Sequence, residues 1–467
     1  MKTRLALSLL PALASVAAET SCPTILIPNT WYPPITGPGW QGQVVAAGLT
    51  KPRSLAFDST GALLVVESGK GISRHQFTDL GGTCLMPNHS HMLVELPRLN
   101  HGLALSASGD TIYASTPDSV LSWPYDARRG RVTGRSRIII ANMSNSDLVT
   151  RTLLMSRSRP NILIVSRGGP EDNIALAEKV ENGFNQIKAF DLDELKDRGT
   201  DATYDFVKDG TVLGWGLRNS VGVGEHPLTG GIWAVENSVD RVTRNGVAVH
   251  EYNPGDELNF LGYLNGTGTG KNFGYPNCFA VWYKDEIPEN EGLDIGMQFA
   301  ERETEELTDE TCAEKYEPPR LTFPAHNSPM DIKFEGDGSA AYVSFRGSFE
   351  GGKGYGYEIV RVLFDTTTGE PVLPANSGEV ISDIRPIFNL DLSKCPENCF
   401  RPVGMAWDSN GRLWFASDST GEIYVLYKLP GRDRQFIVPE GYYGKDSASG
   451  KGHVELQLWV ESPQELG

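Results

Sequence analysis

The sequence predicts an all-β fold, a six-bladed β-propeller, on three observations. One phrase recurs six times along the 467 residues: an apolar strand, a turn rich in Gly or Asp, and a second apolar strand, which is the pattern of a β-hairpin. The copies follow one another at intervals of roughly 50 to 110 residues, as expected of blades that bury their faces against their neighbours around a central axis. No long stretch shows sustained helical periodicity, and the 51 Gly and 29 Pro suit a chain dense in turns. The six copies span residues 57–67, 105–115, 155–166, 224–236, 333–345 and 407–418.

Residues 1–18 have the pattern of a secretory signal peptide. Lys2 and Arg4 precede an apolar run from Leu5, and small residues end the segment at Ala18. The run is too short to span a bilayer, and no later segment is both long and apolar enough. We therefore expect a protein that is secreted to the extracellular space and has no membrane anchor.

The propeller is expected to occupy residues 19–430 as a single domain. Within it, residues 43–47 are predicted to form an outer strand that pairs with the last blade and removes an exposed sheet edge. Residues 279–320 are strongly acidic and bracketed by two cysteines, which indicates a solvated insertion. Residues 431–467 are predicted to be a polar tail.

The six cysteines predict disulfides, because export brings the chain into an oxidising compartment. Sequence does not determine the connectivity, although chain order favours Cys22 with Cys84, Cys278 with Cys312, and Cys395 with Cys399. The alternative, a metal or redox pair at Cys395 and Cys399, lacks a second Cys or His cluster. Three glycosylation tripeptides, at Asn88, Asn142 and Asn265, also agree with a secretory route.

A basic or imidazole side chain stands just upstream of each hairpin, in a chain whose formal net charge is -17. That charge argues against nucleic acid or an anionic membrane as a partner. Equivalent loops of all blades open on one end of the ring, so these side chains are predicted to converge around a central cofactor site. Crowded cations need a multiply charged anion, and the histidines can move protons near neutral pH. The alternative is that each Arg pairs with a local carboxylate. The positions are Arg53, His101, Arg151, Arg218 with Asn219, His326 and Arg401.

A second polar segment offers ligands for a hard cation. Residues 254–259, followed by 272–276, supply carbonyl and carboxylate oxygens of the kind that Ca²⁺ prefers. The same residues also suit an ordinary turn, and the two interpretations stay open.

These segments resemble the sugar dehydrogenases that depend on pyrroloquinoline quinone (PQQ), in particular the secreted fungal pyranose dehydrogenases of the auxiliary-activity class, and also soluble glucose dehydrogenase and L-sorbosone dehydrogenase. The similarity extends over about residues 48–426. It rests on GLRNSVGVGEHPLTGGIWAVEN with Asp240, GDELNFLG leading into NFGYP, PAHNSPMDIKF before VSFRGS, and RPVGMAWDSNGRLWFASD before GEIY.

The resemblance implies that PQQ lies over the propeller axis, held by cations from several blades, with Ca²⁺ on its quinone. In the family, backbone carbonyls hold the metal, which here implies Glu251 and Tyr252. Arg346 falls where relatives carry a polar residue near the cofactor. The positions matched to cofactor contacts are Arg53, Arg218, Asn219, His326 and Arg401, and the ring of cations adds Arg151.

The catalytic base departs from the family pattern. In soluble glucose dehydrogenase a general-base His precedes the third-blade strand, whereas Leu148 stands in the matching stretch here. Either another histidine takes the proton, with His326 as the first candidate and His101 as the second, or catalysis is impaired or directed at a different substrate.

The expected function is oxidation of a hydroxyl of a mono- or small saccharide, an aldose, pyranose or ketoaldose, with PQQ and Ca²⁺. By resemblance, the electrons pass to an external acceptor, either a haem protein or a copper oxygenase, and the acidic insertion is either a solvated loop or a docking site for such a partner. One alternative is a Ca²⁺-dependent propeller hydrolase of the lactonase type, which would need Glu, Asn and Asp where this chain has Arg and His. The other is a non-catalytic propeller that binds carbohydrate.

Overall fold

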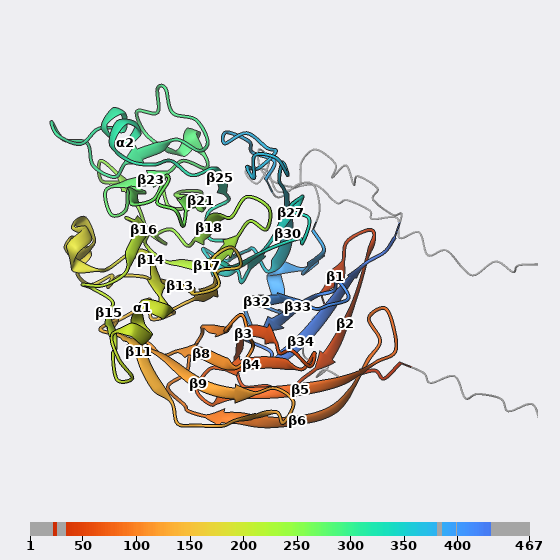
Figure 1. Cartoon of the computed structure of the whole chain (residues 1–467). Helices are drawn as coiled ribbons and strands as arrows, with labels where there is room; N and C mark the ends of the chain where they lie inside the picture. Colours follow the sequence, from red (N-terminus) through yellow and green to blue (C-terminus); the bar gives the residue numbers. More distant parts are fainter. Residues whose placement is uncertain (1–21, 26–33, 381–384, 398, 431–467) are drawn as a thin grey trace, which may run out of the picture.

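The computed structural model describes residues 22–25, 34–380, 385–397 and 399–430. Six sheets of four to six strands are arranged around a central axis, and the predicted six-bladed, all-β propeller is confirmed (Figure 1). The predicted signal peptide and the predicted polar tail lie outside the described residues. None of the helices in the described ranges is long and apolar enough to cross a membrane.

The innermost strands of consecutive blades lie next to one another around the axis. Each is the first strand of its sheet, and it begins at the end of the ring where the predicted site residues stand. They are β3 (Pro52–Phe57), β7 (Leu103–Leu105), β12 (Leu153–Met155), β17 (Ser220–Glu225), β26 (Pro329–Phe334) and β32 (Pro402–Trp407).

Three further strands complete each blade, and these four strands are antiparallel to their neighbours. The short strands β15 (Tyr204–Asp205) and β22 (Lys271–Asn272) add in parallel to the outer edges of blades 2 and 3. Blade 1 adds β4 (Leu63–Glu67), β5 (Gly71–Asp79) and β6 (Leu85–Glu95); blade 2 adds β8 (Thr111–Ser115), β9 (Val120–Asp126) and β11 (Arg137–Ala141); blade 3 adds β13 (Ile162–Arg167), β14 (Gln186–Asp191) and β16 (Thr211–Trp215). Blade 4 adds β18 (Gly231–Glu236), β21 (Asp256–Tyr263) and β25 (Leu321–Phe323); blade 5 adds β27 (Ala340–Phe345), β30 (Glu358–Leu363) and β31 (Ile387–Phe388).

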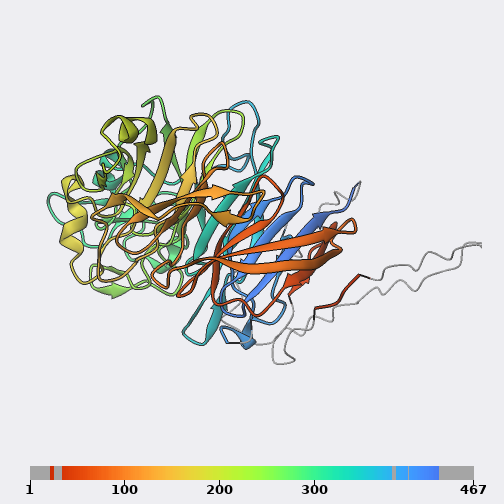
Figure 2. The same ribbon diagram turned by 60° about the horizontal axis from the view of Figure 1, so that its bottom comes forward.

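The last blade is completed by the N-terminal part of the chain. β2 (Trp40–Ala46) pairs antiparallel with β34 (Glu422–Lys428), next to β33 (Leu413–Ser417), and Gly42 is opposite Leu426. Figure 2 shows the blue strands of blade 6 beside the orange strands of blade 1. The predicted closing strand is therefore confirmed: β2 is the outer strand of blade 6 and covers the edge of β34.

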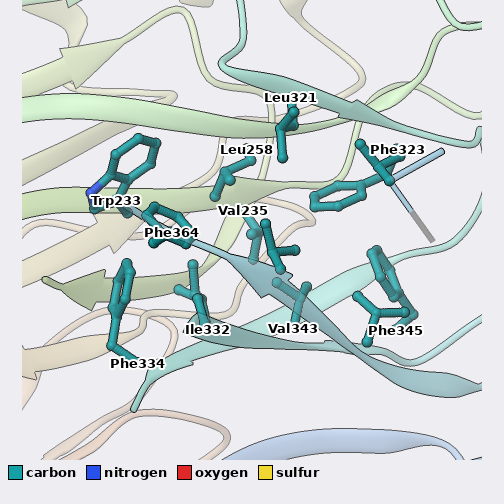
Figure 3. Close-up of a cluster of buried hydrophobic side chains, with 14 residues drawn as sticks. Trp233, Val235, Leu258, Leu321, Phe323, Ile332, Phe334, Val343, Phe345 and Phe364 are labelled. Atoms are coloured by element: carbon teal, nitrogen blue, oxygen red, sulfur yellow. The ribbon is translucent and has the colours of Figure 1, made fainter. Parts of the chain in front are cut away.

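Apolar side chains fill the space between neighbouring blades. Figure 3 shows Trp233 and Val235 of blade 4 facing Ile332 and Val343 of blade 5, all fully buried. Burying one large apolar side chain contributes about 1.5–3 kcal/mol, so this layer holds the two blades in one relative position. The loops that carry the predicted site residues of these blades are positioned by that packing.

The predicted insertion lies between β21 and β25 and has its own short elements. β23 (Cys278–Ala280) pairs with β24 (Gln298–Ala300), and a short helix, α2 (Asp309–Lys315), follows (Figure 1). The disulfide Cys278–Cys312 ties α2 to β23. The other two predicted bridges, Cys22–Cys84 and Cys395–Cys399, are also present.

Candidate functional site

The predicted cofactor contacts come from loops that enter the innermost strands. Arg53 is the second residue of β3, and Arg401 immediately precedes β32. His101 lies two residues before β7, and His326 lies three residues before β26. Because these strands stand side by side around the axis, their first residues gather at one end of the propeller.

Two arginines share one carboxylate, Asp418, which follows β33, and a third arginine is joined to them through backbone carbonyls. Arg53 Nη1 lies 2.5 Å and Arg346 Nε lies 2.8 Å from Asp418 Oδ2. Arg401 Nε donates to the backbone carbonyl of Arg346 at 3.1 Å, and its guanidinium also donates to the carbonyl of Gly347. We call Arg53, Arg346, Arg401 and Asp418 the arginine cluster. It joins blades 1, 5 and 6.

The electrostatics of the arginine cluster show an excess of positive charge. Burial raises the pKa of Asp418, but the charges of Arg53 and Arg346 outweigh it and hold that pKa below its ordinary value. Burial lowers the pKa of Arg53, and Arg346 lowers it further against the attraction of Asp418. Burial and then Arg346 also lower the pKa of Arg401. Each guanidinium thus disfavours the charge of its neighbours.

His101 is a neutral hydrogen-bond donor in this arrangement. Arg53 Nε donates to His101 Nδ1 at 3.2 Å, so Nδ1 carries no hydrogen and Nε2 of the neutral ring does. Burial, followed by the nearby charge of Arg53, lowers the pKa of His101 well below its ordinary value. This geometry favours donation from Nε2 rather than acceptance of a proton.

His326 has the same tautomer as His101, with its hydrogen on Nε2, but it uses that hydrogen to bind a backbone carbonyl of the chain. Its backbone lies in the left-handed region, with φ of 67°, and its Nε2 lies 2.7 Å from the carbonyl of His250. A carbonyl only accepts, so Nε2 carries the hydrogen and the Nδ1 of the neutral ring keeps its lone pair. The ring packs against Tyr355, with 5.2 Å between centroids. Of the two candidate bases, His326 is the one that is ready to accept a proton.

The carbonyl partner of His326 belongs to the predicted metal loop. The backbone N–H groups of Glu251 and Tyr252 donate to the side chain of Glu286 at 3.2 and 3.0 Å. In a trans peptide the N–H and C=O groups point in opposite directions, so the carbonyls of His250 and Glu251 face away from Glu286. In the part of the chain that the structure describes, no group of three or more His, Cys, Asp or Glu side chains is placed to hold a metal ion. The predicted ligands are backbone carbonyl oxygens, those of Glu251 and Tyr252, and oxygen is the ligand that a hard cation such as Ca²⁺ prefers.

The carboxylates of the second polar segment have internal partners. Asp256 accepts hydrogen bonds from the backbone N–H groups of Ser238 at 3.0 Å and Ser328 at 2.8 Å. Glu257 accepts one from Asn259 Nδ2 at 2.8 Å. Burial raises the pKa of both carboxyls to about 7. These contacts favour the structural turn over a cation site built from these side chains.

Arg151 does not join the arginine cluster. It is fully buried, and its guanidinium donates to the carbonyls of Met143 at 2.7 Å and Leu148 at 2.8 Å, among others. Burial, followed by the charge of Arg167, lowers its pKa to about 9. Arg151 therefore anchors the loop that contains Leu148, as expected of an Arg with local partners, although its partners are carbonyls rather than a carboxylate.

Arg218 and Asn219 also face partners on their own side of the ring. Arg218 Nε lies 3.0 Å from Glu171 Oε1, and Asp240 lies 3.5 Å from its guanidinium. The backbone carbonyl of Asn219 accepts from the N–H of Asn237 at 3.1 Å, and the side chain of Asn219 is half-buried. The positive charge of Arg218 is therefore balanced by two carboxylates of the same chain, those of Glu171 and Asp240.

Two residues that organise the site were not predicted. Asp418 ends the last hairpin phrase, FASD, and an acidic residue among predicted cations was a signal that could have been used. Glu286 lies in the acidic insertion, 33 residues after Asn253. Its carboxylate accepts a hydrogen bond from Asn253 Nδ2 at 3.0 Å. Nothing in the local sequence distinguishes Glu286 from the other acids of that segment.

Comparison with known proteins gives consistent matches over nearly the whole described chain. Residues 34–429 match the model of the TrAA12-like family. The chain is 45% identical over 425 residues to a PQQ-dependent sugar dehydrogenase of Hypocrea jecorina, covering 90% of this chain and 96% of that protein. It is 33% identical over 427 residues to a PQQ-dependent pyranose dehydrogenase of Coprinopsis cinerea, of which it spans 56%.

Solved structures agree with these matches. A calcium structure of the Trichoderma reesei carbohydrate-active enzyme of family AA12 has a TM-score of 0.83 and 46% identity, over 87% of this chain and 99% of that one. The holo form of the PQQ domain of Coprinopsis cinerea pyranose dehydrogenase has a TM-score of 0.80 and 31% identity, over 87% and 99%. A PQQ-bound aldose sugar dehydrogenase from Streptomyces coelicolor, at 17% identity and a TM-score of 0.53, shares the fold.

Proposed function

This chain belongs to the TrAA12-like family, and we propose that it is a PQQ-dependent sugar dehydrogenase that oxidises a hydroxyl of a mono- or small saccharide. The observation that carries the proposal is the arginine cluster, in which Arg53 and Arg346 share one carboxylate and Arg401 is bound to the backbone of Arg346. An arginine does not lose its proton in a protein, so the surplus charge calls for an anionic ligand.

The donor set of the arginine cluster fits PQQ, which carries three carboxylates. A guanidinium offers two parallel N–H groups to a carboxylate, and such pairs are stronger than neutral hydrogen bonds. Arg53, Arg346 and Arg401 would hold these carboxylates, each from a different blade. This excess of arginine argues against a lactonase-type hydrolase, because the positive guanidinium groups would repel the Ca²⁺ ion that such an enzyme uses.

The two histidines would divide the proton chemistry between them. When bound, PQQ accepts the two electrons of the alcohol, and Ca²⁺ on its quinone would polarise the quinone oxygens. His326 Nδ1, with its lone pair, would take the proton of the sugar hydroxyl as general base. His101 Nε2–H would remain a donor to an oxygen atom in the site, held in that tautomer by Arg53. The carbonyls of Glu251 and Tyr252 are the proposed ligands of Ca²⁺.

We further propose that the protein is secreted and that its electrons pass to an external acceptor, a haem protein or a copper oxygenase. The apolar run of residues 5–18 after Lys2 and Arg4 supports export.

Cofactor uptake by the purified apoprotein tests the proposal. Titration with PQQ and Ca²⁺ in a calorimeter should give a dissociation constant below about 1 μM, equivalent to about -8 kcal/mol. A matched variant, Arg128→Ala, removes an exposed arginine from blade 2 and should bind equally well. Dye reduction across a panel of aldoses and ketoaldoses then tests catalysis. Failure to take up PQQ would contradict the dehydrogenase proposal, and uptake without turnover would favour the non-catalytic carbohydrate-binding alternative.

A further inference from the structure

One carboxylate of the acidic insertion gathers three donors from the predicted metal loop. Glu286 accepts the N–H of Glu251 at 3.2 Å, the N–H of Tyr252 at 3.0 Å and Asn253 Nδ2 at 3.0 Å. Two of these donors are consecutive backbone groups. A carboxylate offers enough lone pairs for all three contacts, whereas an amide offers only one acceptor oxygen.

Asn253, in the predicted metal loop, also binds the backbone of the acidic insertion. Its Oδ1 accepts the N–H of Trp282 at 2.9 Å and of Tyr283 at 3.1 Å, and its Nδ2 also donates to the carbonyl of Tyr283 at 2.9 Å. Asn253 is fully buried. The insertion and the loop therefore order each other through these six hydrogen bonds around Glu286 and Asn253.

The contacts of Glu286 determine which way the loop carbonyls point. Because the N–H of Glu251 faces Glu286, the carbonyl of the same trans peptide, that of His250, faces the opposite side. That carbonyl accepts the hydrogen of His326 Nε2 at 2.7 Å. The next carbonyl, that of Glu251, is turned in the same way by the contact of Tyr252 N–H with Glu286.

We infer that Glu286 is a positioning residue for His326: by ordering the 250–253 loop, it holds the His250 carbonyl in place and so keeps His326 in the tautomer whose Nδ1 accepts a proton. The acidic insertion thereby has a role that its charge pattern alone did not indicate. The catalytic consequence rests on the proposed function, but the effect on the tautomer does not.

The test compares two variants that remove one negative charge from adjacent positions. Glu286→Gln leaves one acceptor oxygen for donors that now use two. Asp285→Asn is the control, because Asp285 is exposed and has the same neighbours in sequence. The readout is the ¹⁵N spectrum of histidine-labelled full-length protein, with the His326 signal assigned by its loss in His326→Gln.

We expect wild type and Asp285→Asn to show His326 protonated at Nε2 alone, and Glu286→Gln to show a mixture of both tautomers. In the enzyme loaded with PQQ and Ca²⁺, Glu286→Gln should lower kcat by about 10- to 100-fold, the usual range for a residue that orients a site group. The milder variant Glu286→Asp keeps the charge but shortens the reach, and should give a smaller change in the same direction.

An unchanged His326 tautomer in Glu286→Gln, or protonation of Nδ1 in the wild type, would overturn the inference. Equal loss in Asp285→Asn would assign the effect to charge alone and also overturn it. If the tautomer shifts as expected but the wild type oxidises no sugar, the positioning role stands and the proposed function fails. Should Glu286→Gln not fold, the spectrum of Glu286→Asp decides.

Discussion

Two groups of like charges lie at the same end of the propeller, a half-buried group of arginines and a buried group of carboxyls, and they differ in how their repulsion can be relieved. The arginine cluster joins blades 1, 5 and 6, whereas Glu236, Asp256 and Glu257 form a carboxyl group at the end of β18 and the start of β21 in blade 4. All three acids are at least nine-tenths buried, and Glu236 stands opposite Glu257 in the sheet. We call them the carboxyl cluster.

The difference lies in how each cluster can relieve its own repulsion. Burial, reinforced by Glu257, raises the pKa of Glu236 well above its ordinary value, and burial raises those of Asp256 and Glu257 to about 7. Acids can therefore become neutral by taking up protons from water. Arginines have no such route, because their pKa stays too high even when burial lowers it. A ligand anion is the remaining means of neutralising the arginine cluster, which is why that cluster, and not the carboxyl cluster, points to a cofactor.

The largest expected effect comes from removing the carboxylate that the arginines share. Asp418→Asn leaves Arg53 and Arg346 without the carboxylate that they share, and breaking a buried ion pair in this way costs about 3–5 kcal/mol. Urea unfolding of the apoprotein measures this loss in the free energy of unfolding. Glu350→Gln, at an exposed position on β28 (Ser348–Glu350), is the control and should change stability by less than about 0.5 kcal/mol. A loss below about 1 kcal/mol for Asp418→Asn would mean that the arginines do not depend on it.

Next in size is the contrast between Arg401 and Arg218. Arg401 donates to carbonyls of Arg346 and Gly347, so its charge is available to a ligand, whereas Arg218 is paired with Glu171. Arg401→Ala should weaken PQQ binding by about 10- to 100-fold, or about 1.5–3 kcal/mol. Arg218→Ala should weaken it by less than about threefold. Calorimetric titration compares the two, and a larger loss for Arg218→Ala would move the cofactor contact to blade 4.

The smallest effect is a change in how stability depends on pH. Glu257 in the folded state keeps its proton up to about pH 7, while in the unfolded chain it ionises near its ordinary value of about 4.3. Its contribution to stability is therefore present at low pH and lost as pH rises from about 4 through about 7. Glu257→Gln cannot ionise, so its stability should fall less steeply over that window, by at most about 1.4 kcal/mol per pH unit.

Unfolding free energies at pH 5, 6, 7 and 8 give this slope for both proteins. Parallel curves for wild type and Glu257→Gln would show that the carboxyl cluster is ionised in the folded state, and the contrast with the arginine cluster would be lost.

Local patterns were sufficient to predict the propeller. Each hairpin is encoded by strand alternation around a turn, so six copies predict six blades without any knowledge of their packing. The same reading placed residues 43–47 against the last blade, and the structure has β2 (Trp40–Ala46) there. Chain order also predicted all three disulfides.

The position in the repeat predicted where the backbone of each site residue lies, but not the direction in which its guanidinium group points. Arg53, Arg151 and Arg401 occupy equivalent places before or within innermost strands. Arg151 nevertheless turns into its own loop, because Leu148, with φ of 44°, brings its carbonyl within 2.8 Å of that guanidinium. The direction of a long side chain depends on acceptors that come from other parts of the chain.

The sequence by itself determined the six blades, the strand that closes them and the residue types at the entrance of each innermost strand. The blades depend on contacts between residues near one another in the chain, and the entrance residues and the closing strand follow from the repeated period of a closed ring. Only the tertiary structure decided that Asp418 would be shared by Arg53 and Arg346, and that Glu286 would order a loop 33 residues upstream. Both contacts join segments that are far apart in sequence, and their energy depends on distance and burial, which arise only when the blades pack.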